Sequence, residues 1–549
     1  MSKNLSQLAR RKGLGGLLFD DLGQVIDRKG VITEDDLQEM ADRHLVGTAN
    51  VYATASSYDF LGVNRQKKKA YVCNGSACML AGAQSELTSA LEQKLGQGEV
   101  GEMCCLGRCY ENGAFHYEDD NYSYRDIADL DEIINQKQGS PVDDYRVHTS
   151  GTAVLTADLP DTHFIQILKT QFKRSPEELL NEIRTSELRG RGGAGFPIAI
   201  KLDTVRNQNS EEKYIVCNAD EGDPGAFSDR YLLERQTYSV LTGMILTGYI
   251  TGAKEGVVYL RAEYPDAIRI TRKAIDELNA MFPFVREDGS GIEFELYLVP
   301  AHGAYICGEE TALLNSIEGQ RPEVRTRPPF PAIEGLFGQP TLINNVETLA
   351  CIPYILDRGG AQYASLGTDR SKGTKLLSLD GFFNRPGLYE VPMGTSLSEV
   401  VYEMAGGFRQ EIKAIQVGGP LGGIVPMEKI PELTLDFESF KEAGFLLGHA
   451  SIVCIPKSFP MIRYMEHLFS FTAHESCGKC FPCRIGAKRG AEMLEKAQTE
   501  SFKIDRALMN DLLETLQLGS LCGLGGGIPL PIQNILNYFE EELHTYFIH

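Results

Sequence analysis

Residues 188–197 read LRGRGGAGFP, and the residues that follow, IAIKLDTV, have the pattern of a helix. A strand-like run, KYIVCN, occupies residues 213–218. Glycines permit positive φ and close backbone approach, and the amide groups of a loop that opens a helix favour an anion. The stretch therefore indicates a phosphate-bearing cofactor in an α/β domain. A tight turn that binds no ligand is an equally good interpretation of the loop alone.

The surrounding sequence continues the same alternation. Strand-like runs GVVYLRAE (256–263) and IEFELYLVP (292–300) lie between helical stretches, which predicts a mostly parallel sheet covered by helices over about 152–375. Two acidic loops, ADEGDPG (219–225) and HGAYICGEET (302–311), follow probable strands. Carboxylates beyond strand ends in such sheets hold the hydroxyl groups of nucleotides. Solvated turns and helix capping by Glu309 and Glu310 are the alternative.

Composition limits the classes of function. The chain has 549 residues and is 42% hydrophobic, which is enough for several cores. Its 54 Lys and Arg against 75 Asp and Glu give a net charge of -21, which argues against nucleic-acid binding. The longest apolar run, 240–253, is too short to span a membrane and predicts a buried helix. The N-terminus lacks the apolar stretch of a secretory signal, so we expect a cytoplasmic protein.

Most of the thirteen cysteines lie in two short stretches. In the first, Cys477, Cys480 and Cys483 are spaced by two residues, and Cys522 follows in SLCGLGG. Three closely spaced thiolates and a distant fourth suit a [4Fe–4S] cluster. Zinc held by the same four thiolates is the main alternative, and packed free cysteines are a weaker one.

The second set is Cys73 and Cys78 with Cys105 and Cys109. Both pairs fall in glycine-containing turns, where backbone amides can approach cluster sulfurs, and four thiolates suit a [2Fe–2S] centre. Cys104 competes with Cys105 as a ligand. Two separated cysteine pairs are also typical of structural zinc, which stays a serious alternative.

The sequence divides into five segments. Residues 1–62 read as short amphipathic helices with Thr33 as a helix cap, and residues 63–140 as a small α/β unit that begins in a basic segment, 65–69. A polar linker is expected at 139–151. The α/β domain of 150–375 is followed by a β-rich domain at 376–455 and a helical domain at 456–549.

Several motifs are recognisable as a set: GRGGAGFP, NADEGDPGAFSDR, GAYICGEETALLNSIEG, PPFPA, NNVETL and ESCGKCFPCRIG. Together they resemble the NADH-binding flavoprotein subunit of respiratory complex I and the related diaphorase subunits of soluble or bifurcating hydrogenases and NAD-dependent formate dehydrogenases. The resemblance covers about 150–549. The first 140 residues look like the complex I partner subunit that carries a [2Fe–2S] cluster on a thioredoxin-like domain.

The resemblance implies a multidomain α/β protein. Its parts would be the thioredoxin-like domain, a Rossmann-like FMN and NADH domain, a β-grasp domain at 376–455 and a C-terminal helical bundle with an iron–sulfur cluster. It also implies the residues that bind FMN. These are Gly190, Arg191, Gly192, Lys201, Asn218, Asp220, Tyr305, Gly308, Glu309, Asn344, Asn345 and Thr348.

By the same resemblance, NADH would stack over the flavin near Glu221, Glu310 and Phe330. The chain departs from complex I at two places. After Lys201 it reads LDTV where complex I members have aromatic residues, and it has Glu221-Gly-Asp223 where they have Glu-Ser-Glu. The second variant is more similar to hydrogenase-linked, formate-dehydrogenase-linked or bifurcating relatives.

We therefore expect an NAD(H)-dependent oxidoreductase subunit. A hydride would pass directly between NADH and FMN with no catalytic side chain, and single electrons would pass through the clusters. Expected partners are an iron–sulfur electron-transfer subunit and a catalytic hydrogenase or formate dehydrogenase subunit. The alternatives are a complex I-type input subunit and a zinc-stabilised assembly module without redox function.

Overall fold

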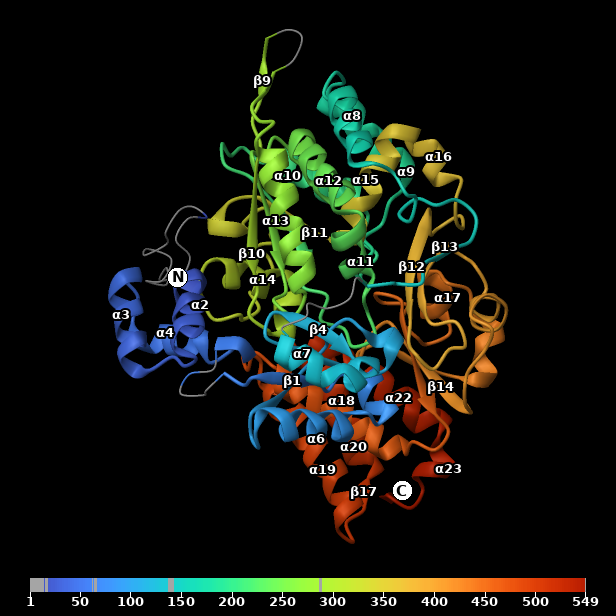
Figure 1. Cartoon of the computed structure of the whole chain (residues 1–549). Helices are drawn as coiled ribbons and strands as arrows, with labels where there is room; N and C mark the ends of the chain where they lie inside the picture. The colour runs from blue at the N-terminus through green and yellow to red at the C-terminus, as the bar shows by residue number, and fades with distance from the viewer. Residues whose placement is uncertain are drawn as a thin grey trace.

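The computed structural model describes residues 14, 18–61, 63, 67–136, 143–285 and 289–548 (Figure 1). Three regions interpreted from the sequence lie partly outside the described residues. They are the N-terminal segment, positions 65–66 of the basic segment, and positions 139–142 of the expected linker.

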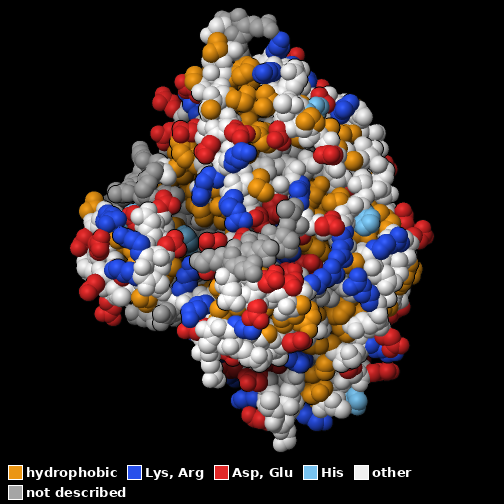
Figure 2. Space-filling model, in the orientation of Figure 1, with side chains coloured by type: hydrophobic (Ala, Val, Ile, Leu, Met, Phe, Trp, Pro, Cys, Tyr) orange, Lys and Arg blue, Asp and Glu red, His pale blue; other side chains and the backbone are white. Residues whose placement is uncertain are grey.

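The first described elements form a helical lobe at the left of Figure 1 and of Figure 2. It contains α2 (Leu18–Lys29), α3 (Glu34–His44) and α4 (Thr48–Ala55). The predicted cap at Thr33 is confirmed, because its side chain accepts from Asp36 N while the Asp36 carboxylate accepts from Thr33 N. The lobe is anchored to the central domain where the Tyr58 hydroxyl donates to Ser316 Oγ at 2.7 Å.

A small four-stranded sheet comes next, in the order β2-β1-β3-β4. Its β1 and β2 strands are parallel, whereas β3 and β4 form an antiparallel hairpin beside β1. Its elements are β1 (Ala70–Cys73), α5 (Ser76–Ala81), α6 (Gln84–Leu95), β2 (Val100–Met103), β3 (Ala114–Tyr117), β4 (Asp120–Ser123) and α7 (Leu130–Gln136). The small α/β unit expected here is confirmed.

The central domain is built on four parallel strands in the order β10-β7-β6-β11. The strands are β6 (Tyr214–Ala219), β7 (Glu255–Leu260), β10 (Glu295–Pro300) and β11 (Thr341–Asn345). The first three match the apolar runs found in the sequence. Periodicity does not reveal β11, since TLINN is short and ends in two asparagines.

Helices surround this sheet (Figure 1). They are α8 (Asp161–Gln171), α9 (Pro176–Ser186), α10 (Ile198–Arg206), α11 (Ser228–Arg235), α12 (Thr237–Thr251), α13 (Pro265–Asn279), α14 (Glu310–Ile317), α15 (Val346–Arg358) and α16 (Gly360–Ala364). Helix α12 is the predicted buried helix, and nearly all its side chains are buried. It packs closely on α15, because a Cβ at Gly243 would lie 2.0 Å from the Leu349 carbonyl oxygen.

The β-rich domain is a six-stranded sheet in the order β15-β14-β16-β12-β13-β5. Its elements are β12 (Thr374–Leu379), β13 (Gly387–Pro392), β14 (Ile412–Val417), β15 (Gly423–Pro426), α17 (Phe437–Glu442), β16 (Ser451–Pro456) and the edge strand β5 (His148–Thr149). Strand β5 comes from the segment interpreted as a linker. The buried Glu390 carboxylate fixes the residues just after that segment by accepting from the backbone N–H groups of Val154, Leu155 and Thr156.

The C-terminal part is the predicted helical bundle, seen at the bottom of Figure 1. Its helices are α18 (Met461–Glu475), α19 (Ala487–Thr499), α20 (Arg506–Gly519), α21 (Gly523–Gly527), α22 (Pro529–Tyr538) and α23 (Glu540–Leu543). None of the helices in the described part of the chain has the length and apolar character needed to cross a membrane.

The α12–α15 contact makes a test of this packing possible. We expect Gly243→Ala to destabilise the protein by about 2 kcal/mol, because the added methyl group would collide with the Leu349 backbone, which must then move. The midpoint of thermal unfolding should fall. Gly23→Ala is the control, since Gly23 also lies within a helix, α2, and its added Cβ would make only an ordinary contact, 3.6 Å from His302 Cε1. Equal midpoints for the two variants would contradict the close packing.

Candidate functional site

The candidate flavin site lies at the carboxyl edge of the central sheet. Strands β6 and β11 are adjacent and parallel, and Asn345 pairs in register with Asn218. Asp220, which follows β6, therefore lies beside Asn344 and Asn345 at the end of β11. The Asn218 side chain donates to the Gly308 carbonyl at 2.8 Å, which draws the loop after β10 to the same edge. Parallel sheets bind their ligands at this edge.

The glycine loop closes over this edge from the side of α10. Arg191 is fully buried, and its backbone N–H donates to Thr348 Oγ1 at 2.8 Å. One guanidinium nitrogen donates to the Tyr363 hydroxyl at 2.9 Å and to the Lys372 carbonyl. A Cβ at Gly192 would lie 3.1 Å from Asn345 Cβ, so the loop approaches β11 closely.

Two buried polar atoms at this edge, Asp220 Oδ2 and Asn344 Nδ2, have no hydrogen-bond partner among the described residues. Arg191 Nε and Nη1 are also unpaired, but that guanidinium lies beside Tyr363 of α16. Burial also raises the pKa of Asp220 well above its usual value. Buried polar groups are normally satisfied, so these atoms point to a ligand. An amide and a carboxyl suit hydroxyl groups, and the amides of the glycine loop suit a phosphate, which together match the chemistry of FMN.

Charged groups on α10 and α14 border the same region. Lys201 donates to the Ile343 carbonyl at 3.1 Å, and its ammonium lies 3.8 Å from Glu310. Burial lowers the pKa of Lys201. Glu309 caps α14 by accepting from Thr311 N and Ala312 N. This bears out the capping interpretation of Glu309 without excluding a second contact.

Phe330 and Glu310 are available at the surface of this region. The Phe330 side chain is 54% exposed, and Arg327 donates to Glu310 at 2.8 Å. Arg327 was not identified from the sequence, since an arginine in a loop carries no signal of its own. Exposed aromatic and charged groups beside the buried edge are suited to a dinucleotide that enters from solvent.

The side chains of Glu221 and Tyr305 are both held by hydrogen bonds within the protein. The Glu221 carboxylate is buried and accepts from Asp229 N at 2.9 Å and Arg230 N at 3.0 Å. It therefore caps α11 and faces away from solvent. The Tyr305 hydroxyl donates to Asp223 at 2.7 Å. Asp223, the residue that departs from the complex I pattern, thus holds Tyr305 in place.

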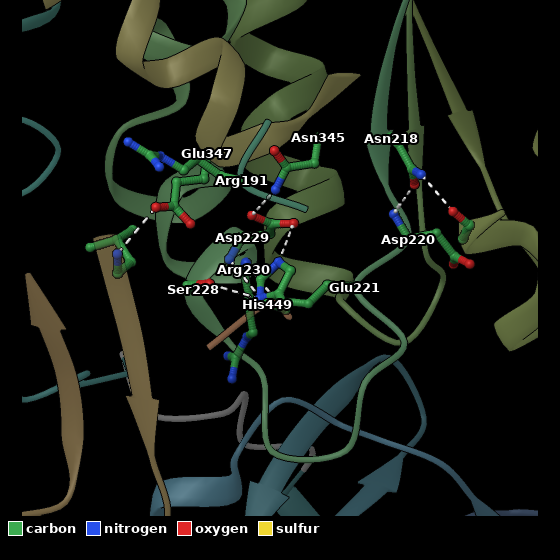
Figure 3. A network of polar contacts seen from close by, with 12 residues as sticks. Arg191, Asn218, Asp220, Glu221, Ser228, Asp229, Arg230, Asn345, Glu347 and His449 are labelled. Atoms are coloured by element: carbon green, nitrogen blue, oxygen red, sulfur yellow. Dashed lines mark hydrogen bonds and ion pairs between the residues drawn. The ribbon is translucent and has the colours of Figure 1, made fainter. Parts of the chain in front are cut away.

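Figure 3 shows that the polar groups around this edge form a network. It includes His449 from the β-rich domain and Asp229 at the start of α11, which sequence reasoning did not select. Their nearest approach is 3.2 Å, between Nε2 and Oδ2. No local motif could have found this pair, because 220 positions separate the two residues.

The four C-terminal cysteines come together as predicted. Cys480 and Cys483 are buried members of one cluster of packed side chains, and Cys477 and Cys522 pack against that cluster. Charge interactions also link Cys522 to Cys477 and Cys483. Burial raises the pKa of Cys483 to about 11 and that of Cys522 to about 12, because an apolar setting disfavours the thiolate form. A metal cluster would supply the positive charge that stabilises thiolates there.

The second cysteine set also converges. Cys105 Sγ lies 3.3 Å from Cys109 Sγ, and Cys73 hydrogen-bonds to both Cys105 and Cys78. Hydrogen bonds from Cys109 and Cys73 hold the pKa of Cys105 well below its usual value. Cys104 instead lines a small polar pocket with Arg261, Glu263 and Glu475. The geometry favours Cys105 over Cys104 as a ligand.

Comparison with known families agrees with the three sites. Residues 183–354 match the model of the Nuo51 FMN-binding domain, and residues 463–546 match the NADH-ubiquinone oxidoreductase-F iron–sulfur binding region. Residues 8–138 match the thioredoxin-like [2Fe–2S] ferredoxin model. The F 2 subunit of an NADH-quinone oxidoreductase from Rhizobium meliloti (strain 1021) is 40% identical over 70% of this chain and 94% of that protein.

The chain belongs to the family of the NADH-quinone oxidoreductase F subunits. Its cofactors are those of the matched domains, FMN, a [2Fe–2S] and a [4Fe–4S] cluster, and the family is NADH-dependent.

Within this family, hydrogenase subunits are also similar. The HndC subunit of an NADP-reducing hydrogenase from Solidesulfovibrio fructosivorans is 41% identical over 68% of this chain and 76% of that protein. A chain in the crystal structure of an H2-reduced NAD+-reducing [NiFe]-hydrogenase superposes with a TM-score of 0.84 at 28% identity, and the match covers 97% of this chain and 94% of that one. This match extends over the N-terminal domain, which confirms the expected fold.

The two adjacent cysteines provide a test of the N-terminal site. We expect Cys104→Ser to keep the EPR signal of a reduced [2Fe–2S] centre and Cys105→Ser to lose it, because only Cys105 faces Cys73 and Cys109. Iron and zinc contents of both variants should be measured with the EPR spectra. Zinc without iron in the wild type, or loss of the signal from Cys104→Ser alone, would contradict this ligand set.

Proposed function

We propose that this chain is the flavoprotein subunit of a hydrogenase or formate dehydrogenase complex, where it oxidises NADH or reduces NAD. The observation that carries the proposal is the match over nearly the whole chain to a subunit of an NAD+-reducing hydrogenase, thioredoxin-like domain included. The similarity to HndC supports it. A complex I-type input subunit is the alternative, favoured by the 40% identity to the F 2 subunit of Rhizobium meliloti.

The site residues explain how this chain would hold its cofactors. FMN, when bound, exchanges a hydride with NAD(H) and passes on single electrons. The glycine-loop amides around Arg191 would bind its phosphate, and Asp220 and Asn344 its hydroxyl groups. Phe330 and the Glu310–Arg327 pair would receive the dinucleotide. The chain then needs no acid, base or nucleophile of its own, because positioning and exclusion of water suffice.

We further propose that a partner subunit docks at the C-terminal cysteine loop. Two apolar side chains of the loop, Phe481 and Ile485, are 65% and 41% exposed, and Leu518 and Leu521 before Cys522 are 77% and 42% exposed. The end of α20 packs against the loop, since a Cβ at Gly519 would lie 2.8 Å from Pro482 Cγ. Clustered exposed apolar groups are typical of interfaces. An iron–sulfur protein docked there would receive electrons over a short distance.

We propose a cytoplasmic location, consistent with the absence of disulfides among the thirteen cysteines, all of which are described and free. We also propose that the chain consists of five segments, 1–62, 63–140, 150–375, 376–455 and 456–549. We further propose electron bifurcation as a reaction of the complex. A zinc-stabilised module without redox function is less favoured, because buried unpaired atoms suited to a flavin lie beside the sheet.

The order of the electron route can be tested at the C-terminal cluster. We expect Cys480→Ala to remove the [4Fe–4S] signal and to lower reduction of a distant acceptor by at least about tenfold, while NADH still bleaches the flavin absorbance. The hydride step needs only the flavin site, which Cys480 does not line. FAD, or no flavin, in the acid-released cofactor would contradict the proposed function. Full iron content with wild-type acceptor rates would contradict the cluster assignment.

The docking surface is testable separately. We expect Leu518→Glu to abolish copurification of the partner subunits without loss of FMN or iron, because it puts a charge in the centre of an apolar contact. Leu45→Glu is a matched control, since Leu45 is 82% exposed on the N-terminal lobe. An intact complex with Leu518→Glu would show that partners bind elsewhere.

A further inference from the structure

His449 belongs to the β-rich domain, but its side chain contacts the flavin domain. It lies in the turn before β16, between Gly448 (φ +54°) and Ala450 (φ +64°), so that both neighbours have left-handed backbone. Glycine tolerates this conformation, but alanine adopts it at a cost. The turn also touches the glycine loop, because a Cβ at Gly193 would lie 3.8 Å from Gly448 Cα. The imidazole is buried.

The ring meets two carboxylates of the flavin domain. Nε2 lies 3.2 Å from Asp229 Oδ2, and Nδ1 lies 3.7 Å from Glu221 Oε1 and 3.5 Å from Ser228 Oγ. Two buried carboxylates this close would repel each other in a medium of low dielectric constant. An imidazolium between them removes the repulsion.

Asp229 links His449 to Asn345, a residue of the flavin site. Asn345 Nδ2 donates to Asp229 Oδ1 at 3.5 Å, and Asn345 Oδ1 accepts from both Thr348 N and Thr348 Oγ1. Thr348 Oγ1 in turn accepts from Arg191 N at 2.8 Å. An unbroken chain of polar contacts thus runs from His449 to the glycine loop. Figure 3 shows its first part, from His449 through Asp229 to Asn345. Because the Asn345 amide gives its nitrogen to Asp229, its oxygen is oriented toward Thr348.

We propose that His449 is a positioning residue of the flavin site: its buried ring, which comes from the β-rich domain, orients Asn345 and the glycine loop through Asp229. This inference rests on the function proposed above, in which those groups hold FMN. The β-rich domain would thereby contribute to cofactor binding indirectly, through Asp229 and Asn345.

The charged groups around the ring are consistent with a protonated His449. Asp229, Glu221 and Asp223 face it from the flavin domain, and Lys375 on β12 is the nearby cation. Burial alone would lower the pKa of His449, but the charge and hydrogen bond of Asp229 and the charge of Glu221 outweigh it and raise that pKa to about 9. The imidazolium is therefore present at neutral pH and is lost as the pH rises through about 9.

A metal ion is a poorer occupant of this position. Ligand atoms of Glu221, Asp229 and His449 lie within 4.8 Å of one another. Both oxygens of Glu221, however, already accept backbone N–H groups of α11. A cation there would have to compete with the helix cap, whereas an imidazolium does not.

The test measures the affinity of full-length, flavin-depleted protein for FMN, by quenching of flavin fluorescence between about pH 7.5 and 10. We expect His449→Gln to weaken binding about tenfold at the lower pH, which is the effect of losing one charge-assisted hydrogen bond. The wild-type dissociation constant should rise about fivefold as the imidazolium is lost over this range. In His449→Gln this rise should be absent. Ionisation of the flavin itself affects both proteins equally.

His116→Gln is the matched control, because His116 is a buried, hydrogen-bonded histidine of the N-terminal sheet. It should bind FMN as the wild type does. A wild-type affinity and pH profile in His449→Gln would overturn the inference alone, whereas a wild-type chain that binds no FMN would overturn the proposed function and the inference with it. If His449→Gln loses its iron and fails to fold, a wild-type dissociation constant that does not change with pH would still overturn the inference.

Discussion

The four parallel strands of the central sheet impose the constraint on which the site depends. Parallel strands end at the same edge, so the loops after β6, β10 and β11 meet there although they are far apart in sequence. At that edge Asn218 binds the loop that contains Gly308. Helix α12, buried on almost every side, holds the sheet and α15 together. The glycine loop then needs only short contacts with β11 and α15 to close over the cofactor position.

Buried charge is the second organising feature. Lys375 and Glu347 form a completely buried ion pair, and Glu347 also accepts from Leu376 N. Arg261 donates to the Glu221 carbonyl and to the Cys104 carbonyl, so it bridges the flavin domain and the N-terminal cysteine loop. Buried pairs of this kind add little stability relative to apolar packing, but they fix geometry when every partner is present. Here they join three domains around one site.

Buried polar atoms without a hydrogen-bond partner, in contrast to these completed ion pairs, indicate where a ligand binds. A network that satisfies most of its members leaves Asp220 and Asn344 with an unused acceptor and an unused donor at one edge. The C-terminal cysteine set shows the same imbalance, since burial raises the pKa values of Cys483 and Cys522. In each case the chain provides groups that a bound cofactor would complete. This is why the candidate sites can be recognised from the protein groups themselves.

The sequence by itself determined the chemistry of the sites. Cysteine spacing, the glycine loop and the strand-like runs are local signals, because ligand spacing and backbone freedom are properties of neighbouring residues. They sufficed for the fold class, the cofactors and three of the four central strands. Tertiary structure alone decided which groups meet. It made Glu221 a helix cap, turned Cys104 away from Cys73, added β5 to the six-stranded sheet and brought His449 to Asp229. Each of these depends on contacts between residues distant in the chain, and such contacts leave no periodicity or spacing by which a sequence could reveal them.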